Sequence, residues 1–226
     1  REKSTGIIEE IPHKGIVKYA KPAGVIASLV PTTNPELTPP YTGLYALKAL
    51  DAVIFSPHPR SKGTTFEMVR VMREALRRQG APADLFQCIE HPSIPVTQYL
   101  MAQCDLTLAT GGQPMVRAAY SSGKPAYGVG AGNSTMVIDE TADVDIAARN
   151  TRTSKTSDFG SGCSADGNIL IDDRIYAAMV AALVAEGGYL ASSREAAALE
   201  TVMWDDHGHR LAQTVACPPQ VLARAA

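Results

Sequence analysis

Short apolar runs and helix-length amphipathic segments alternate along the first half of the chain. Residues 23–30 and 52–55 are apolar runs followed by prolines, and runs of this length next to turn residues predict buried β-strands. Residues 42–50, between them, are long enough for a helix. Residues 64–79 carry apolar side chains at helical spacing with arginines opposite, and Gly80 is a stop signal. This order predicts a repeated strand and helix arrangement.

The same alternation continues beyond the second run. It predicts a helix over residues 96–103, a strand over 106–109, a helix over 115–121, and strands over 126–129 and 136–138. Strands that alternate with helices are typical of a sheet whose neighbouring strands run parallel. We therefore expect an α/β fold, with an open, mostly parallel sheet and helices on both of its faces.

The second half of the chain has a different composition. A helix is predicted over residues 143–149, and the polar run 151–162 is interpreted as a linker or domain junction. A strand over 168–171 and helices over 172–185 and 193–203 follow, and the tail contains Pro218 and Pro219 and no clear terminus. We expect one domain over residues 1–152 and the start of a second α/β domain over 153–226.

Composition and charge exclude several classes of function. The chain has 226 residues, 45% of them hydrophobic, and a net charge of −2, which is enough to bury one large core or two modest ones. Charges of both signs are mixed along the chain, so a nucleic-acid partner is not expected. No apolar run is long enough to span a bilayer, and residues 1–4 do not resemble a signal peptide. We expect no membrane partner and a cytoplasmic location.

The cysteines and histidines do not predict a metal site. Cys88, Cys104, Cys163 and Cys217 lie far apart in the sequence, without the close pairs of zinc sites, which suggests reduced thiols. Residues 205–209, Asp-Asp-His-Gly-His, are the densest set of ligand types, but this spacing beside a glycine is more typical of a solvated turn. We expect no metal.

Cys163 has an unusual setting for a cysteine. It lies in residues 157–164, Ser-Asp-Phe-Gly-Ser-Gly-Cys-Ser, a polar and glycine-rich stretch just before a predicted strand. A reactive cysteine needs an accessible thiolate near backbone N–H groups or positive charge, which a turn flanked by glycines can supply. The alternative is a small buried core residue, which is the usual role of an unpaired cysteine. The local sequence leaves both interpretations open.

Three loops follow predicted strands, at residues 31–35, 56–60 and 110–113. Ligands of open α/β sheets bind outside the carboxyl ends of the strands. Gly111 and Gly112 would let the backbone approach a nucleotide closely, although two glycines after a strand are more often a tight turn. The glycine-rich run 128–133 has the same ambiguity.

The motifs form an ordered set along the chain. Their order resembles the aldehyde dehydrogenase superfamily, and more narrowly its coenzyme A-acylating branch, over nearly the whole chain. The surroundings of Cys163 are most similar to those of the acylating sulfoacetaldehyde dehydrogenases. The residues that carry the resemblance are 31–35 (Pro-Thr-Thr-Asn-Pro), 55–62 (Phe-Ser-Pro-His-Pro-Arg-Ser-Lys), 109–125 (which begins Ala-Thr-Gly-Gly), 128–133 (Gly-Val-Gly-Ala-Gly-Asn) and 160–163 (Gly-Ser-Gly-Cys).

The resemblance implies an enzyme that oxidises a short aldehyde, anionic in the sulfoacetaldehyde case, to acyl-coenzyme A. It implies NAD or NADP as cofactor and coenzyme A as co-substrate. Cys163 matches the nucleophile, which forms a thiohemiacetal and then a thioester. Asn34 matches the amide that donates to the developing oxyanion together with the backbone N–H of Cys163. From the residues alone, a turn before proline at the end of a strand is the favoured interpretation of Asn34.

The resemblance also implies where the cofactor binds. The first domain, 1–152, would be an NAD(P)-binding domain incomplete at its N-terminus, and the second, 153–226, the truncated beginning of the catalytic domain. Family members are about twice as long and form homo-oligomers, so we expect a dimeric or tetrameric parent and doubtful activity for this stretch alone. The residues matched to the ribose loop, the pyrophosphate turn and their neighbours are Thr33, Ser56, Pro57, His58, Thr110, Gly111, Gly112, Gly128 and Val129.

One departure from the wider superfamily concerns the acyl acceptor. Hydrolytic members carry a glutamate that activates water, and the corresponding stretch here is residues 128–131, Gly-Val-Gly-Ala. Without that carboxylate, transfer to a thiol is expected. The alternatives are a hydrolytic semialdehyde dehydrogenase and a non-catalytic nucleotide-binding fragment with a packed Cys163.

Two clusters of cations bear on the choice of aldehyde and on the choice between NAD and NADP, and the sequence decides neither. Arg149, Arg152 and Lys155 precede the cysteine turn and could bind an anionic substrate, although a solvated helix end is the simpler interpretation. Arg60 and Lys62 could contact the 2′-phosphate of NADP or face water.

Overall fold

The computed structural model describes residues 3–130 and 132–226, which fall into two compact units within Arg1–Ala131 and Gly132–Ala226. The division lies earlier than the domain boundary expected at 152/153. The expected linker over 151–162 is wrong in its first half, because helix α5 (Val144–Thr156) continues through it. The Thr153 and Thr156 hydroxyls donate to helix carbonyls of Arg149 and Arg152, at 2.9 and 2.8 Å, and so fit the helix despite their polarity.

The first unit contains the parallel sheet that the sequence predicts. Its strands lie in the order β5-β4-β3-β6-β7 and all pair in parallel. The chain builds outward from β3 to β5 on one side and then returns to add β6 and β7 on the other, so the direction of winding reverses between β3 and β6. The strands are β3 (Val25–Val30), β4 (Ala52–Pro57), β5 (Phe86–Cys88), β6 (Leu106–Thr110) and β7 (Ala126–Val129).

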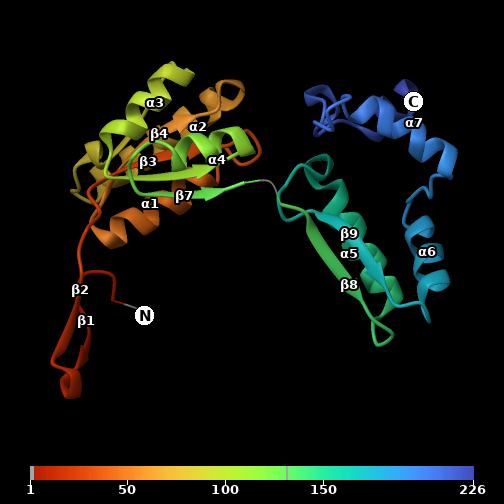
Figure 1. The fold of residues 1–226 in the computed structure, drawn as a ribbon, viewed down its shortest axis with the longest axis horizontal. Coiled ribbons are helices and arrows are strands. Elements are labelled where there is room, and N and C mark those ends of the chain that lie inside the picture. The colour runs from red at the N-terminus through yellow and green to blue at the C-terminus, as the bar shows by residue number, and fades with distance from the viewer. Residues whose placement is uncertain (1–2, 131) are drawn as a thin grey trace. The chain divides into compact units, whose positions relative to one another are not determined.

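Helices cover both faces of this sheet (Figure 1). Side chains of β3 alternate between the two layers: Ile26 and Val30 pack in the core with α1 and α2, whereas Ala27 and Leu29 pack in the core with α3 and α4. The predicted α/β class is therefore confirmed. The helices are α1 (Thr38–Ala49), α2 (Lys62–Arg78), α3 (Ile94–Gln103) and α4 (Gln113–Tyr120), with short 3-10 turns at Pro59–Ser61 and Ala83–Leu85.

A hairpin that the sequence did not predict precedes the sheet. Strands β1 (Gly6–Ile11) and β2 (Ile16–Ala20) pair antiparallel. A 3-10 turn over Pro12–Lys14 and Gly15, at φ 64°, join them. Its residues show no regular alternation of apolar and polar side chains, which is why the pattern gave no strand signal there. Most of its side chains are exposed.

Two carboxylates fix the amino end of β3. The N–H of Gly24 donates to Asp51 and the N–H of Val25 donates to Asp105, each at 2.8 Å. Gly24 has a φ of 118°, and a Cβ there would lie 3.0 Å from the carboxyl carbon of Asp105, so glycine is required by both backbone and space. These two hydrogen bonds therefore fix β3 at its amino end, opposite to the loop that follows its carboxyl end.

The second unit is built on two parallel strands, β8 (Ser134–Ile138) and β9 (Asp166–Ile171), with α5 and α6 (Tyr176–Ala185) packed against them. Ile138, Ala148 and Met179 form its buried centre. Helix α7 (Ser193–Met203) begins at a capping box of Ser192 and Glu195. The tail, for which the sequence analysis assigned no element, forms a 3-10 turn at Ala212–Thr214 and helix α8 (Pro219–Ala225). Within the described residues, no helix is both long and apolar enough to cross a membrane.

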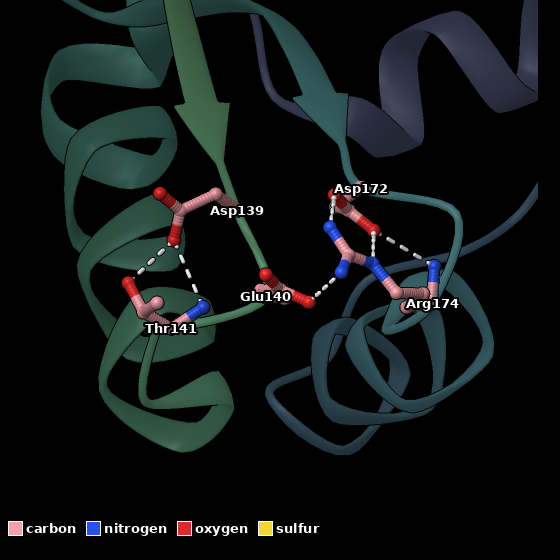
Figure 2. Close-up of polar contacts among 5 residues, drawn as sticks. All are labelled: Asp139, Glu140, Thr141, Asp172 and Arg174. Atoms are coloured by element: carbon pink, nitrogen blue, oxygen red, sulfur yellow. Dashed lines mark hydrogen bonds and ion pairs between the residues drawn. The ribbon is translucent and has the colours of Figure 1, made fainter.

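An ion-pair cluster joins the carboxyl ends of β8 and β9, as Figure 2 shows. Arg174 donates to Asp172 through Nε and Nη2, at 3.0 and 2.9 Å, and also pairs with Glu140. Asp139 accepts from the backbone N–H and hydroxyl of Thr141, at 2.9 and 2.6 Å. Because Glu140 follows β8 and Asp172 follows β9, Arg174 connects the two strands where they end.

This cluster predicts a pH-dependent contribution to the stability of the second unit. Hydrogen bonds from Arg174 lower the pKa of Asp172, and those from Thr141 lower the pKa of Asp139. A carboxyl whose pKa is lower in the folded state than in the unfolded state stabilises the fold at any pH above its unfolded-state pKa, which is near 4. This stabilisation is lost as the pH falls through the folded-state pKa. We expect Arg174→Met to lower the urea midpoint at pH 7, with the difference from wild type shrinking toward pH 3. A difference that is unchanged at pH 3 would assign the effect to packing instead.

Candidate active site

The loops that follow four strands of the first sheet leave from the same edge. Val30 is level with Pro57, Leu29 with Ala109, and Thr110 with Val129 in the strand registers. This edge contains the point between β3 and β6 where the direction of winding reverses, which is where open α/β sheets bind ligands. The structure therefore brings together the predicted residues of the first unit at or near one edge: Thr33, Asn34, Ser56, Pro57, His58, Thr110, Gly111, Gly112, Gly128 and Val129.

The loop after β3 is held by its backbone. The carbonyl of Asn34 accepts from the N–H of Thr38 at 3.1 Å, and the hydroxyl of buried Thr65 in α2 donates to the carbonyl of Pro35 at 3.2 Å. Among the described residues, the half-buried side-chain amide of Asn34 makes one long contact, 3.5 Å, with the hydroxyl of Thr33. A contact of this length is weak. The amide therefore has donor capacity left for another acceptor.

The end of β4 and the residue that follows it offer one exposed side chain among three predicted residues. The hydroxyl of Ser56 is buried and bonds to that of Thr97 in α3 at 2.8 Å, and Pro57 is also buried. Any nucleotide contact from Ser56 would thus have to come from its backbone. His58 is exposed and its Nδ1 accepts from the N–H of Arg60 at 3.2 Å. Sequence reasoning had no means of seeing the Thr97 contact.

His58 is a neutral donor at this edge. Although His58 is exposed overall, partial desolvation of its ring lowers its pKa, and the charge of Arg60 lowers this pKa further. The imidazole is therefore uncharged at pH 7. Because Nδ1 accepts a hydrogen bond, the ring proton lies on Nε2. Nε2–H is then the group that His58 can offer to a ribose hydroxyl or a phosphate oxygen.

The turn after β6 is open. A Cβ built on Gly112 would come no closer than 3.7 Å to Pro114, and one on Gly111 no closer than 3.8 Å to Met115. Gly112 caps α4, whose first turn carries no acidic residue. The N-terminus of a helix offers free N–H groups and a positive dipole end to an anion. The turn formed by Thr110, Gly111 and Gly112 therefore fits a nucleotide phosphate.

The end of β7 is tied to this turn and to α4. The N–H of Gly111 donates to the carbonyl of Val129 at 3.0 Å. The N–H of Gly128 donates to the hydroxyl of Tyr120 at 2.9 Å, so that the last residue of α4 contacts the strand. Sequence reasoning missed Tyr120. The available signal was a glycine inside a strand, which often marks the close approach of another group.

Cys163 lies on an exposed turn of the second unit. The N–H of Ala165 donates to the carbonyl of Gly162 at 3.0 Å, which places Cys163 and Ser164 at the two corners. The N–H of Asp166 donates to the hydroxyl of Ser154 in α5 at 3.0 Å and fixes the far side of the turn. The thiol is exposed. In this unit, Cys163 is therefore not the packed core residue of the alternative interpretation.

The backbone just before this turn is strained. Asp158, Phe159 and Gly160 have φ values of 48°, 50° and 69°, three successive residues in the left-handed region. For residues other than glycine this region costs about 1 kcal/mol or more each. The hydroxyl of Ser161 donates to the carboxylate of Asp158 at 2.6 Å and supports the arrangement. The exposed thiol thus follows a segment whose conformation the surrounding structure must maintain.

The other three cysteines are shielded to different degrees. Burial raises the pKa of Cys88 to about 11, and the charge of Glu90 adds to this effect. Cys104 is buried, 3.4 Å from the hydroxyl of Thr107, and Cys217 is half-buried. Cys163 is the exposed thiol of the four.

The cations and histidines that the sequence singled out have separate roles. Arg152 pairs with Glu186 at 3.1 Å, so part of the cluster before the cysteine turn is already engaged. Asp205 accepts from the N–H groups of His207 and His209 and pairs with the ring of His209 at 3.2 Å, which closes a turn. In the part of the chain that the structure describes, no three His, Cys, Asp or Glu side chains are grouped as metal ligands.

The first unit is an open parallel α/β sheet with a reversal in its winding and a glycine turn that opens a helix. The second unit carries a candidate nucleophile, the exposed thiol of Cys163. The family model described as "Aldehyde dehydrogenase family" matches residues 2–196. The chain therefore belongs to the aldehyde dehydrogenase family.

Known relatives support this membership. A sulfoacetaldehyde dehydrogenase of Acholeplasma sp. is 50% identical over 89% of this chain and 42% of its own length. An acylating sulfoacetaldehyde dehydrogenase of Bilophila wadsworthia is 39% identical over 99% of this chain and 48% of its own. The crystal structure of an acetylating aldehyde dehydrogenase from Geobacillus thermoglucosidasius has a TM-score of 0.89 and 39% identity, over 99% of this chain and 50% of that one. The chain thus spans half or less of the length of these relatives.

Proposed function

We propose that the protein containing this chain is a coenzyme A-acylating aldehyde dehydrogenase. The overall reaction converts an aldehyde, coenzyme A and NAD(P)⁺ into acyl-coenzyme A, NAD(P)H and a proton. The observation that carries the proposal is the exposed Cys163 thiol on its hydrogen-bonded turn. The relatives named as acylating or acetylating support it.

Cys163 acts as the nucleophile in this proposal. Its thiolate adds to the aldehyde carbon, and the carbonyl oxygen becomes the anion of a thiohemiacetal. The nicotinamide of NAD or NADP, when bound, supplies the acceptor for the hydride whose loss leaves a thioester on Cys163. The thiolate of coenzyme A then attacks the thioester carbonyl, which forms acyl-coenzyme A and returns the thiolate of Cys163.

Asn34 and the edge of the first sheet would serve this chemistry. The side-chain amide of Asn34 offers an uncharged donor of the kind that a developing oxyanion needs. The turn formed by Thr110, Gly111 and Gly112 would receive the cofactor phosphates, and His58 Nε2–H would face the ribose. Thr33, Pro57 and Val129 lie beside these groups, so they would shape the pocket without supplying charge.

The finer substrate proposal is a short anionic aldehyde such as sulfoacetaldehyde. It is supported by the names of the relatives and by two cations close to the cysteine turn in sequence. Arg149 and Lys155 are both exposed on α5. We further propose a dimeric or tetrameric homo-oligomer in the cytoplasm. The free state of all four cysteines fits a reducing compartment.

The accessibility of the four thiols tests the proposed nucleophile directly. We expect iodoacetamide at pH 7 to modify Cys163 at least about tenfold faster than Cys88 or Cys104, because those thiols are shielded and reaction requires an accessible thiolate. Peptide mass spectrometry over a time course measures each rate, and half-buried Cys217 is the internal comparison. Modification of Cys163 no faster than that of Cys104 would favour a non-catalytic nucleotide-binding module.

Replacement of Asn34 tests the oxyanion role. Asn34→Ala should lower kcat by about 10²-fold or more, the scale seen when one oxyanion donor is removed. The exposed Asn150→Ala change in α5 is the matched control and should leave kcat unchanged. A lowered melting temperature with unchanged kcat per folded molecule would instead identify Asn34 as a residue that only shapes the turn.

A further inference from the structure

The carboxyl side of the cysteine turn is held by helix α5 through the backbone of Asp166. The N–H of Asp166, the first residue of β9, donates to the hydroxyl of Ser154 at 3.0 Å. Half-buried Ser154 and buried Thr151 lie three residues apart on α5 and therefore share the face of the helix that is covered. Cys163 and all these residues belong to the second unit. The contact is thus defined within one compact body.

The pairing of β9 with β8 is irregular at the point where the turn joins the strand. Asp166 is level with Ser134 and Asn168 is level with Thr135, so Gly167 is an extra residue in the register. An extra residue of this kind is a β-bulge, which locally disrupts the hydrogen-bond ladder and bends the strand. The sheet therefore holds the first residue of β9 less firmly than the residues that follow the bulge, and the bond to Ser154 is a second support.

The buried side chain of Asp166 makes this support necessary. Asp166 is 6% exposed, and among the described residues its Oδ2 has no hydrogen-bond partner. A buried oxygen without a donor is unfavourable, so other contacts must keep Asp166 in place. On the other side of the turn, Asp158 and Phe159 have strained backbone conformations. Cys163 therefore lies between two unfavourable features, and the hydroxyl of Ser154 opposes the release of the second.

We propose that Ser154 is a positioning residue for Cys163. Its hydroxyl holds the backbone of Asp166 against α5 and thereby fixes the carboxyl side of the turn that presents the thiol. This inference rests on the proposed function, in which the sulfur of Cys163 attacks a bound aldehyde. A turn that is free at one end lets the sulfur occupy more positions, and a displacement of the reacting atoms by about 1 Å can cost about 10²-fold in rate.

Substitutions on α5 of the full-length protein test the inference. Ser154→Ala removes the acceptor of the hydrogen bond, and Ser154→Thr retains it. Thr153→Ala is the matched control, because the Thr153 hydroxyl also donates one hydrogen bond, at 2.9 Å, but to the carbonyl of Arg149 in its own helix. The measurements are hydrogen exchange of the Asp166 amide by mass spectrometry, the melting temperature, NAD(P)⁺ affinity by calorimetry, and kcat for acyl transfer per folded molecule.

We expect Ser154→Ala to speed exchange of the Asp166 amide about fivefold and to lower kcat at least about tenfold. The affinity for NAD(P)⁺ should stay at its wild-type value, because the residues proposed to hold the cofactor belong to the first unit. Ser154→Thr should retain both the slow exchange and the kcat, and Thr153→Ala should change neither. A purely structural role would lower the melting temperature without changing kcat per folded molecule. The inference is overturned if Ser154→Ala keeps the wild-type kcat, or if exchange and kcat change separately in either Ser154 variant.

The proposed function fails by a different result. Wild-type protein that never forms acyl-coenzyme A would contradict the acylating reaction, and the role of Ser154 would fall with it. Wild-type protein that forms acyl-coenzyme A, combined with a Ser154→Ala variant of unchanged kcat, would leave the function standing and remove only the role of Ser154.

Discussion

Cys163→Ala in the full-length protein is expected to lower the rate of acyl transfer by at least about 10³-fold and to leave the affinity for NAD(P)⁺ at its wild-type value. The first effect follows because no other atom in the proposed mechanism can carry the acyl group. The second follows because the residues proposed to hold the cofactor belong to the first unit and the cysteine turn to the second. Coenzyme A-dependent NAD(P)H formation and titration calorimetry measure the two quantities.

Cys217→Ala is the matched control for that experiment. Its thiol is half-buried, 3.5 Å from the carbonyl of Thr214, and it has no proposed role in the reaction. The control should retain wild-type turnover. Turnover by Cys163→Ala comparable with that of Cys217→Ala would show that the nucleophile is another group.

The second large effect concerns the acyl acceptor. Full-length protein mixed with aldehyde and NAD(P)⁺, without coenzyme A, should release reduced cofactor in a burst near one per active site and then stop. In the proposed reaction the thioester on Cys163 should persist, because residue 128, which the family resemblance matches to the water-activating glutamate, is a glycine. The thiol of coenzyme A has a pKa near that of other thiols and is a far better nucleophile at neutral pH.

Adding coenzyme A to the stalled enzyme should restore steady turnover. Stopped-flow absorbance of the reduced nicotinamide measures both the burst and the recovery, and mass spectrometry detects the acylated Cys163 peptide between them. Sustained formation of free acid at a comparable rate without coenzyme A would place the protein in the hydrolytic branch. It would also require a base outside residues 128–131.

Much of the fold could be predicted from the sequence, and the exceptions have physical reasons. Strands β3, β4, β6 and β7 are confirmed. The inner strands β3, β4 and β6 are detectable because parallel strands covered on both faces appear as apolar runs. The hairpin of β1 and β2 was missed because its side chains are mostly exposed and follow no alternation. The polar run 151–162 predicted a linker, but α5 continues to Thr156. The helix begins at a cap formed by Asp143, and the hydroxyl of Thr153 bonds back to a helix carbonyl.

The candidate site shows a similar division. Motif order was enough to select residues that the structure gathers at one edge of the sheet. It could not show that the Ser56 hydroxyl is consumed by Thr97, or that Tyr120 covers Gly128. Both facts depend on which side chains meet across separate elements, and residue types along the chain do not encode that directly.

The bond between Tyr120 and Gly128 also protects the rim of the sheet. The outermost strands, β5 and β7, are the shortest of the five, with three and four residues. An unpaired strand at a rim is a template on which another extended chain can add, and short strands with occupied donors are poor templates. Because Tyr120 takes the N–H of Gly128, another chain that approached β7 would find one donor fewer. The same side chain thus makes aggregation through this rim less favourable.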